Sequence, residues 1–471
     1  MRQTFQFPSK WVAIAGYLAF TILGLMAGIF YLERMMMADA IFQTFAIIKD
    51  QDLGIQVGRF GSAATKIFPW IAIESGLPLK AVLMVYSLSF VIYPFLLYWV
   101  LVRWVKNERM GLVLVLFFTL LTAHTFYWIQ SELLQGCALI IFFYGLLSQW
   151  LPLKTWQLAI LFPLVVVIIF FHPLAFIPFL FLWAFFALEN DYWKQLPYLA
   201  VLAFCFLVLG YKHFIMPPNY YDSGSIKLSE NIFEQFGNIF QVRSTKNFLR
   251  YLVTDYYFFP PLFFWVLSHY IIHKRWLKLG LVFLSTIGFL VLINGTFFWG
   301  ADQYYVESFY QILTIFAATP LVFDILPTFK SQRLVLWLVI GTLAVRLLHI
   351  GLTHRPYTER LQWTQDMLEK TKSYPGTKFM MDREDTPHHK LMLTWGSSYE
   401  TLMLSAMENP DSTRTFIIVD PNVPSEELLK RNNAFLTPFG ALDYDYFQES
   451  PYFHFRDTSY YRVLTKEEIL Q

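Results

Sequence analysis

Two acidic side chains stand beside apolar runs, at places where a carboxylate can do chemistry. Asp39 lies soon after the first run, and Glu132 opens the fourth. A carboxylate there can act as general base on an acceptor hydroxyl, and a second one can bind hydroxyls or assist the base. Each also has a structural interpretation, Asp39 as a solvated helix residue and Glu132 as a helix-start residue favoured by the macrodipole. These two residues are the candidate catalytic groups.

A second set of side chains is suited to binding a substrate at the same surface. An imidazole at the turn before Pro173 can bind a phosphate or donate a proton. Arginine and lysine at the depth of lipid headgroups are natural phosphate ligands, and they are also ordinary interfacial anchors. Two tyrosines near carboxylates can line a sugar pocket or form an aromatic belt. The candidate binding residues are His172, Lys212, Arg243, Lys246, Arg250, Asp302, Tyr304 and Tyr305.

Metal and nucleotide chemistry have weaker signals. Asp50 and Asp52 form a D-x-D pattern that can hold a divalent ion, but acidic residues before Gly54 are also ordinary turn chemistry. We assign no metal site and leave a divalent ion open. The sequence carries no nucleophilic triad, phosphate-binding glycine loop or dinucleotide fingerprint. A net charge of only +2 implies no basic field for nucleic acid, and we expect no nucleic-acid partner.

The elements that must position these residues are membrane spans. The chain has 471 residues, of which 56% are hydrophobic, 19% aromatic and only 15% charged. Soluble domains carry about 25% charged residues, so this composition indicates a membrane protein. Helices are the expected spanning form, because every backbone polar group must be satisfied within the bilayer. About eleven runs are candidate spans, near 11–31, 81–102, 110–128, 133–151, 156–171, 174–188, 196–211, 258–272, 277–298, 308–325 and 333–352.

The short loops between these runs predict an orientation. Lys and Arg recur in alternate short loops, and the loops between them carry none. Because positive charge marks the cytoplasmic side, the N-terminus is expected in the cytoplasm. Three long segments then lie outside, 32–80, 212–257 and a tail that starts near residue 354. The chain is thus predicted to be an all-α polytopic membrane protein, residues 1–353, with an extracytoplasmic domain, 354–471.

The outer segments have patterns of their own. In the first, Met37, Ile41, Phe45 and Ile48 form an apolar stripe, while Asp39 and Asp50 share the opposite side with Gln43 and Ala46, which predicts a helix lying in the membrane interface. Roughly a quarter of the tail is charged, near the soluble average. Strand-like segments at 378–381, 390–395 and 414–419 alternate with helix-like segments at 398–407 and 425–431. This alternation predicts a small α/β domain with a mainly parallel sheet.

The distribution of charge separates two kinds of membrane protein. A transporter usually places ionisable residues inside its spans, and these runs are nearly free of them. Acidic and basic groups gather instead at the outer ends of the runs and in the outer segments. This pattern favours a reaction at the outer surface with one substrate held in lipid, over a path through the bilayer.

On these residues, the chain resembles the GT-C superfamily of multi-span glycosyltransferases, which includes protein mannosyltransferases and lipid A aminoarabinose transferases. The likeness is topological and covers roughly residues 1–350. Asp39, in Met37-Ala-Asp-Ala40, matches the superfamily's usual catalytic base, and Ser131-Glu132 is similar to a pair that opens the fourth span in several of its families. Asp302-Gln-Tyr-Tyr305 resembles a late aromatic segment, although Gln303 stands where those proteins have arginine.

The resemblance implies a polyprenyl-phosphate-linked sugar as donor, a glycan, lipid or protein as acceptor, and transfer at the outer face of a bacterial inner membrane. A metal is optional in this superfamily. Two other functions remain open. A polysaccharide polymerase of the O-antigen type would favour paired arginines in the outer loops, such as Arg243 and Arg250. A noncatalytic membrane subunit would use its soluble tail to dock a partner.

Overall fold

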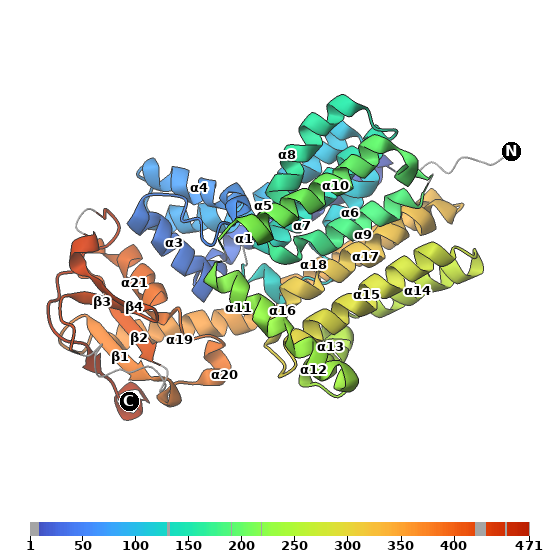
Figure 1. Ribbon diagram of the computed structural model, residues 1–471. Helices are drawn as coiled ribbons and strands as arrows, with labels where there is room; N and C mark the ends of the chain where they lie inside the picture. The colour runs from blue at the N-terminus through green and yellow to red at the C-terminus, as the bar shows by residue number, and fades with distance from the viewer. Residues whose placement is uncertain are drawn as a thin grey trace.

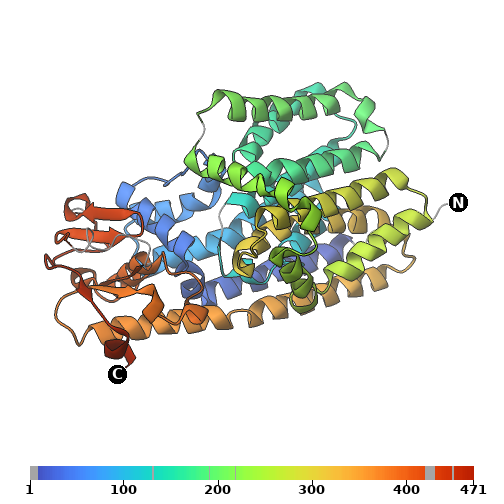
Figure 2. The same cartoon turned by 60° about the horizontal axis from the view of Figure 1, so that its bottom comes forward.

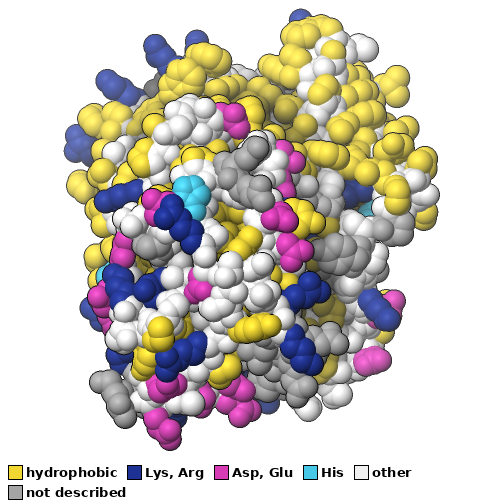
Figure 3. Space-filling view, turned by 90° about the vertical axis from the view of Figure 1, so that its left-hand side faces the viewer, with side chains coloured by type: hydrophobic (Ala, Val, Ile, Leu, Met, Phe, Trp, Pro, Cys, Tyr) yellow, Lys and Arg dark blue, Asp and Glu magenta, His cyan; other side chains and the backbone are white. Residues whose placement is uncertain are grey.

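The computed structural model describes residues 9–129, 132–189, 191–217, 219–419, 430–447 and 450–470. The chain forms an elongated helical bundle with a small α/β domain packed at one end, and the two chain ends lie at opposite ends of the molecule (Figures 1 and 2). Seen from the end that carries the α/β domain, charged side chains cover much of one part of the surface and hydrophobic ones much of the rest (Figure 3). This separation of surfaces suits a bundle set in lipid with one end in water.

Seven helical segments are long and apolar enough to cross a membrane within the described residues. They are Lys10–Ile29, Leu79–Val105, Glu132–Trp150, Leu196–Ile215, Trp276–Thr296, Gln303–Thr328 and Gln332–Thr371. Three of the remaining expected runs form shorter apolar helices, Thr155–Ile169, Pro173–Ala187 and Phe259–Ile272. The structure therefore supports a multi-pass helical membrane protein, while the expected count of about eleven spans is not confirmed.

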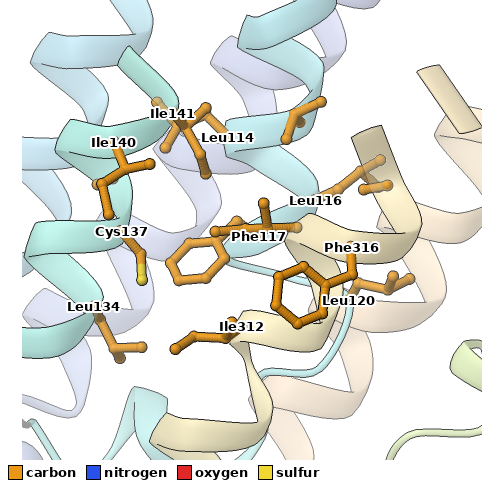
Figure 4. Close-up of a cluster of buried hydrophobic side chains, with 14 of the residues drawn as sticks. Leu114, Leu116, Phe117, Leu120, Leu134, Cys137, Ile140, Ile141, Ile312 and Phe316 are labelled. Carbon is orange, nitrogen blue, oxygen red and sulfur yellow. The ribbon is translucent and has the colours of Figure 1, made fainter. Parts of the chain in front are cut away.

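The helices of the bundle follow the apolar runs closely. They are α1 (Ser9–Ile29), α5 (Leu79–Val100), α6 (Glu108–Phe117), α7 (Glu132–Trp150), α8 (Leu158–Ile169), α9 (Phe176–Ala187), α10 (Leu196–Gly210), α14 (Phe259–Ile272), α15 (Trp276–Thr296), α16 (Gln303–Tyr310), α17 (Ile312–Pro320) and α18 (Gln332–Leu352). Figure 4 shows part of the core, where side chains of α6, α7 and α17 meet around Phe117, Cys137 and Phe316. Cys137 and Cys205 are both free and buried.

The run at 110–128 is not one helix, because α6 ends at Phe117. Two fully buried charged residues hold the irregular segment that follows. Arg346 of α18 donates to the carbonyls of Thr119 and Thr122 at 3.0 and 2.7 Å. Glu307 of α16 accepts the backbone amide of Thr125 at 2.8 Å. The expectation of spans nearly free of charge missed these groups, which replace helical hydrogen bonds that the segment lacks.

The first expected outer segment folds as α2 (Tyr31–Met35), α3 (Ala38–Asp50) and α4 (Ala63–Glu74). The predicted stripe is correct, but its surroundings differ from the expectation. Phe45 packs on Tyr399 and Phe435 of the C-terminal domain, with ring centroids 4.9 and 5.4 Å apart. Protein therefore covers the stripe, and the apolar pattern marks an interface with the C-terminal domain.

The second expected outer segment forms α11 (Tyr220–Ser229), α12 (Asn231–Gln235) and α13 (Arg243–Thr254). The helix α11 lies toward the C-terminal domain, whereas α12 and α13 lie below α15 and α16 in the view of Figure 1. This segment therefore reaches two separate parts of the molecule.

The chain enters the C-terminal domain through α19 (Arg355–Thr371). The domain contains β1 (Lys378–Asp382), α20 (His388–Leu391), α21 (Ser397–Glu408), β2 (Thr415–Val419), β3 (Ala434–Thr437), β4 (Gly440–Asp443), β5 (Arg462–Val463) and α23 (Lys466–Leu470). Strands β2, β1 and β5 form a parallel sheet in that order, and β3 pairs antiparallel with β4. The predicted parallel α/β arrangement is present.

The strand expected at 390–395 is wrong, since this stretch contains the end of α20 and then irregular backbone with Met392 at a φ of 56°. Its carbonyls are satisfied by Arg360, which donates to Leu391 and Leu393, so the segment needs no sheet partner. Most of the helix expected at 425–431 lies outside the described residues.

Candidate active site

A cavity of about 350 Å³ lies where α3, α7, α11 and α16 meet the C-terminal domain. Its walls carry acidic, basic and aromatic side chains drawn from segments that are far apart in the sequence. The lining residues are Asp39, Gln43, Gln56, Val57, Arg59, Trp128, Glu132, Leu133, His172, Tyr221, Tyr305, Phe309, Leu393 and Trp395. We call this space the Asp39 cavity. Four of the predicted site residues line it, namely Asp39, Glu132, His172 and Tyr305.

Asp39 lies in the first turn of α3, just after an extended residue at Met37. Its Oδ2 accepts a hydrogen bond from the indole nitrogen of Trp128 at 3.0 Å. Removal from bulk water raises the pKa of this carboxyl to about 6, the Trp128 hydrogen bond opposes that rise, and the charge of Glu132 adds to it. The group is therefore ionised at neutral pH yet more basic than an ordinary aspartate, which suits a general base.

Glu132 opens α7 and pairs across the cavity wall with Arg59. The Arg59 Nη1 lies 3.3 Å from the Glu132 Oε2, and the guanidinium also lies over the Tyr221 ring, 4.9 Å from its centroid. Arg59 is buried, with 6% of its surface exposed. Sequence reasoning missed this arginine. Its place depends on a turn with positive φ angles at Val57 and Gly58, which the pattern of apolar runs does not reveal.

His172 precedes the short 3₁₀ turn Pro173–Ala175 between α8 and α9. Its Nδ1 accepts a hydrogen bond from the Leu174 amide at 3.1 Å, so the proton of the neutral ring sits on Nε2. Burial, followed by the nearby charges of Arg59 and Lys212, holds the pKa of His172 well below its ordinary value. A neutral imidazole with one donor is available at the cavity wall.

Lys212 does not line the cavity, but its positive charge lies close enough to lower the pKa of His172. Its ammonium group donates to the Ile169 carbonyl at 2.9 Å and lies over the ring of Phe170. The predicted phosphate ligand is thus beside the site, held at the end of α8.

The aromatic segment of α16 is divided between the cavity and its support. Tyr305 lines the cavity, whereas Tyr304 stacks behind Trp128, with ring centroids 4.1 Å apart. The Tyr304 hydroxyl lies 2.8 Å from Asp302 and 3.2 Å from the Met392 carbonyl. Asp302 and Tyr304 therefore hold Trp128 and the C-terminal domain in place, and neither lines the cavity.

Three predicted phosphate ligands lie elsewhere. Arg243, Lys246 and Arg250 are on α13, which is well separated from α3 in Figure 1. The Arg243 amide bonds to the Phe298 carbonyl, and Arg250 lies over the ring of Tyr251. The structure does not bring these three side chains to the Asp39 cavity, because α13 packs against the C-terminal end of α15, where Ser244 donates to the Asn294 carbonyl.

The D-x-D pair at the end of α3 has local partners. Asp50 forms an ion pair with Lys49, and the Asp52 carboxylate accepts the amide of Gly54 at 2.5 Å. Within the described residues, no group of three or more His, Cys, Asp or Glu side chains is arranged to hold a metal ion. The two aspartates serve the turn that follows α3.

The C-terminal domain supplies one wall of the cavity through Leu393 and Trp395. Arg360 of α19 holds this wall. Its guanidinium bonds to both oxygens of Glu400 at 2.6 and 2.7 Å, and to the carbonyls of Met36, Leu391 and Leu393. A Cβ on Gly396 would come within 2.6 Å of the Ala38 Cα, so only glycine allows this approach beside Asp39.

No family model, curated protein or solved structure matches the chain.

Proposed function

We propose that the protein transfers a sugar from a polyprenyl-phosphate donor to an acceptor hydroxyl within the Asp39 cavity. The observation that carries this proposal is the shared space itself. A carboxylate of raised pKa, a buried guanidinium and a neutral imidazole line one cavity of about 350 Å³. The resemblance to multi-span glycosyltransferases names Asp39 as the base independently of its surroundings.

The transfer step needs one base and a partner for phosphate. The acceptor oxygen attacks the anomeric carbon while Asp39 takes the hydroxyl proton. As the new carbon–oxygen bond forms, the bond from the anomeric carbon to the phosphate oxygen breaks, and polyprenyl phosphate leaves with the electron pair. No acid is needed for this leaving group. Arg59 is suited to bind it bidentately, sharing its guanidinium with Glu132, and His172 Nε2 can donate a further hydrogen bond.

The proposal includes a location. The reaction takes place at the outer face of a bacterial inner membrane, with the N-terminus in the cytoplasm and the C-terminal domain outside. In this arrangement α8, α9, α14 and the irregular continuation of α6 also cross the bilayer, which restores about eleven passes. The donor's lipid chain stays in the membrane, and a glycan, lipid or protein acceptor enters from the water. A divalent metal remains optional.

The two alternatives rank lower for specific reasons. An O-antigen type polymerase would use paired arginines, and Arg243 and Arg250 lie on α13, away from the cavity. A noncatalytic subunit would use the tail to dock a partner, but the tail here walls the cavity through Leu393 and Trp395.

Asp39→Asn tests the proposal. Purified protein in proteoliposomes is supplied with a panel of polyprenyl-phosphate sugars, and released polyprenyl phosphate is measured. We expect the variant to lose about 10²–10⁴-fold in rate, the usual contribution of a positioned base. The matched control is Asp366→Asn, an exposed aspartate on α19, which should retain full activity. Full activity in Asp39→Asn would remove the base assignment, and no turnover of any donor by the wild-type protein would favour the noncatalytic alternative.

A further inference from the structure

Arg34 is a buried cation without a matching acid. It lies in α2, and only 2% of its surface is exposed. Its Nη2 donates to the Ser87 carbonyl at 3.1 Å, and its guanidinium lies 4.2 Å from the centroid of the Phe126 ring. Its Nε and Nη1 meet no acceptor among the described residues. No carboxylate of the described chain lies within ion-pair distance of it.

Arg346 is a second buried arginine whose hydrogen bonds can be compared with those of Arg34. It is also fully buried, but its Nε, Nη1 and Nη2 each donate to a backbone carbonyl at 3.0, 2.6 and 2.7 Å. Burying a charge is costly unless hydrogen bonds or an opposite charge compensate for it. Burial lowers the pKa of Arg34 to about 9, so the guanidinium still carries its charge at neutral pH. Its Nε and Nη1 need an acceptor that the described residues do not supply.

A small cavity adjoins Arg34. It has a volume of about 50 Å³, and Phe20, Leu23, Phe90, Phe118 and Phe126 make most of its wall apolar. Its polar lining includes Gln135 and Gln311, whose side-chain oxygens also have no partner among the described residues. One water-sized sphere needs about 10–15 Å³ by this measure, so the space admits a few atoms of that size. We call it the Arg34 cavity.

The Arg34 cavity lies directly behind the wall of the Asp39 cavity. Trp128, Glu132 and Leu133 face the Asp39 cavity, whereas Ile129, Leu134 and Gln135 of the same stretch face the Arg34 cavity. Whatever fills the inner space therefore supports the segment that carries Trp128 and Glu132.

We propose that the Arg34 cavity is a binding site for one small monovalent anion of the size of chloride, accompanied by water. The anion accepts hydrogen bonds from Arg34 Nε and Nη1 and balances the guanidinium charge. Water beside it donates to the side-chain oxygens of Gln135 and Gln311. A polyatomic oxyanion fits poorly, because the space is only about 50 Å³ and most of its wall is apolar, so the outer oxygens would find few donors.

Thermal unfolding of the full-length protein in detergent tests the site. Sodium chloride or bromide is titrated against sodium gluconate at constant ionic strength. We expect the wild-type midpoint to rise with halide, because a ligand that binds only the folded state stabilises it. Arg34→Met should remove this dependence. The matched control is Arg346→Met, which should lower the midpoint and keep the halide response. An identical halide response in wild type and Arg34→Met, or none in either, would overturn the proposal.

A second measurement decides the case if Arg34→Met does not fold. Crystals of the wild-type protein grown in bromide should show an anomalous peak within hydrogen-bond distance of Arg34 Nε and Nη1. Density for water alone, or for the end of a lipid chain, would overturn the assignment. Neither experiment depends on sugar transfer, so the inference stands or falls separately from the proposed function.

Discussion

Charged side chains gather at both ends of the helical bundle, and the two clusters differ in what surrounds them. Near the C-terminal domain, Asp39, Glu132 and Arg59 border a cavity of about 350 Å³. At the end farthest from that domain, Asp324 accepts hydrogen bonds from Lys278 at 2.9 Å, Arg275 at 2.9 Å and Tyr270 at 2.6 Å. The far cluster contains its own partners and stabilises the fold. Both clusters have space beside them, since residues 188–189 and 274–278 line a hollow of about 420 Å³ at the far end. The near cavity differs in its chemistry, because it combines a carboxyl of raised pKa, a buried guanidinium and a neutral imidazole.

The largest effect should come from breaking the far cluster. Asp324→Ala leaves Lys278 and Arg275 without their shared carboxylate, and truncating one partner of a buried pair costs about 3–5 kcal/mol. The thermal midpoint in detergent measures it. Glu132→Gln in the near cluster should cost less, because Glu132 is more exposed than Asp324 and the new amide oxygen still accepts a hydrogen bond from Arg59. Equal losses at the two ends would mean that both clusters are structural.

Arg59→Met should weaken binding of the polyprenyl-phosphate sugar. Charge-assisted hydrogen bonds contribute about 1.5–3 kcal/mol, so we expect the kcat/KM for the polyprenyl-phosphate sugar to fall by roughly 10–100-fold. Arg333→Met, an exposed arginine at the start of α18, is the matched control and should change nothing. A larger loss in Arg250→Met than in Arg59→Met would move the phosphate site to α13.

Trp395→Ala tests whether the C-terminal domain contributes to binding. An aromatic contact is worth about 0.5–1.5 kcal/mol, so the KM should rise by roughly 2–10-fold while kcat changes little. Steady-state kinetics separate the two constants. A fall in kcat without a change in KM would show instead that Trp395 positions Asp39 through α3, where its ring lies 6.0 Å from Phe42.

The smallest effect is a shift along the pH axis. Because burial raises the pKa of Asp39 to about 6, kcat/KM should fall as the pH drops below that value and level off above it. The Glu132 charge contributes to the rise, so Glu132→Gln should move the inflection to lower pH by less than about one unit. An inflection that stays in place would show that another group titrates.

Candidate site residues near the ends of apolar runs could be predicted from the sequence, because a polar residue that follows an apolar run marks where that run ends. Asp39, Glu132 and His172 were found in this way, and the structure gathers them in one cavity. Arg59 and Trp395 could not be found by the same reasoning, since their places depend on a turn and on a domain interface. Arg243 and its neighbours on α13 have the right chemistry, but helix packing directs α13 to another part of the bundle.

The stripe on α3 and the span count also show that sequence patterns do not specify tertiary contacts. Periodicity correctly indicated one apolar face, but it does not specify whether lipid or protein covers that face, and Phe45 meets the C-terminal domain. The run at 110–128 is apolar enough for a span, yet Arg346 and Glu307 stabilise irregular backbone after Phe117. Composition does not reveal which backbone groups a distant buried charge will satisfy.

The contact between Gly396 and Ala38 has a consequence for how the protein is made. One wall of the Asp39 cavity emerges from the ribosome early and the opposite wall more than three hundred residues later. Until the later wall is translated and folds, Phe45 of α3 lacks the aromatic side chains of Tyr399 and Phe435 that cover it. A nascent chain halted before residue 391 would therefore lack Leu393 and Trp395, and its Asp39 cavity would still be open on one side.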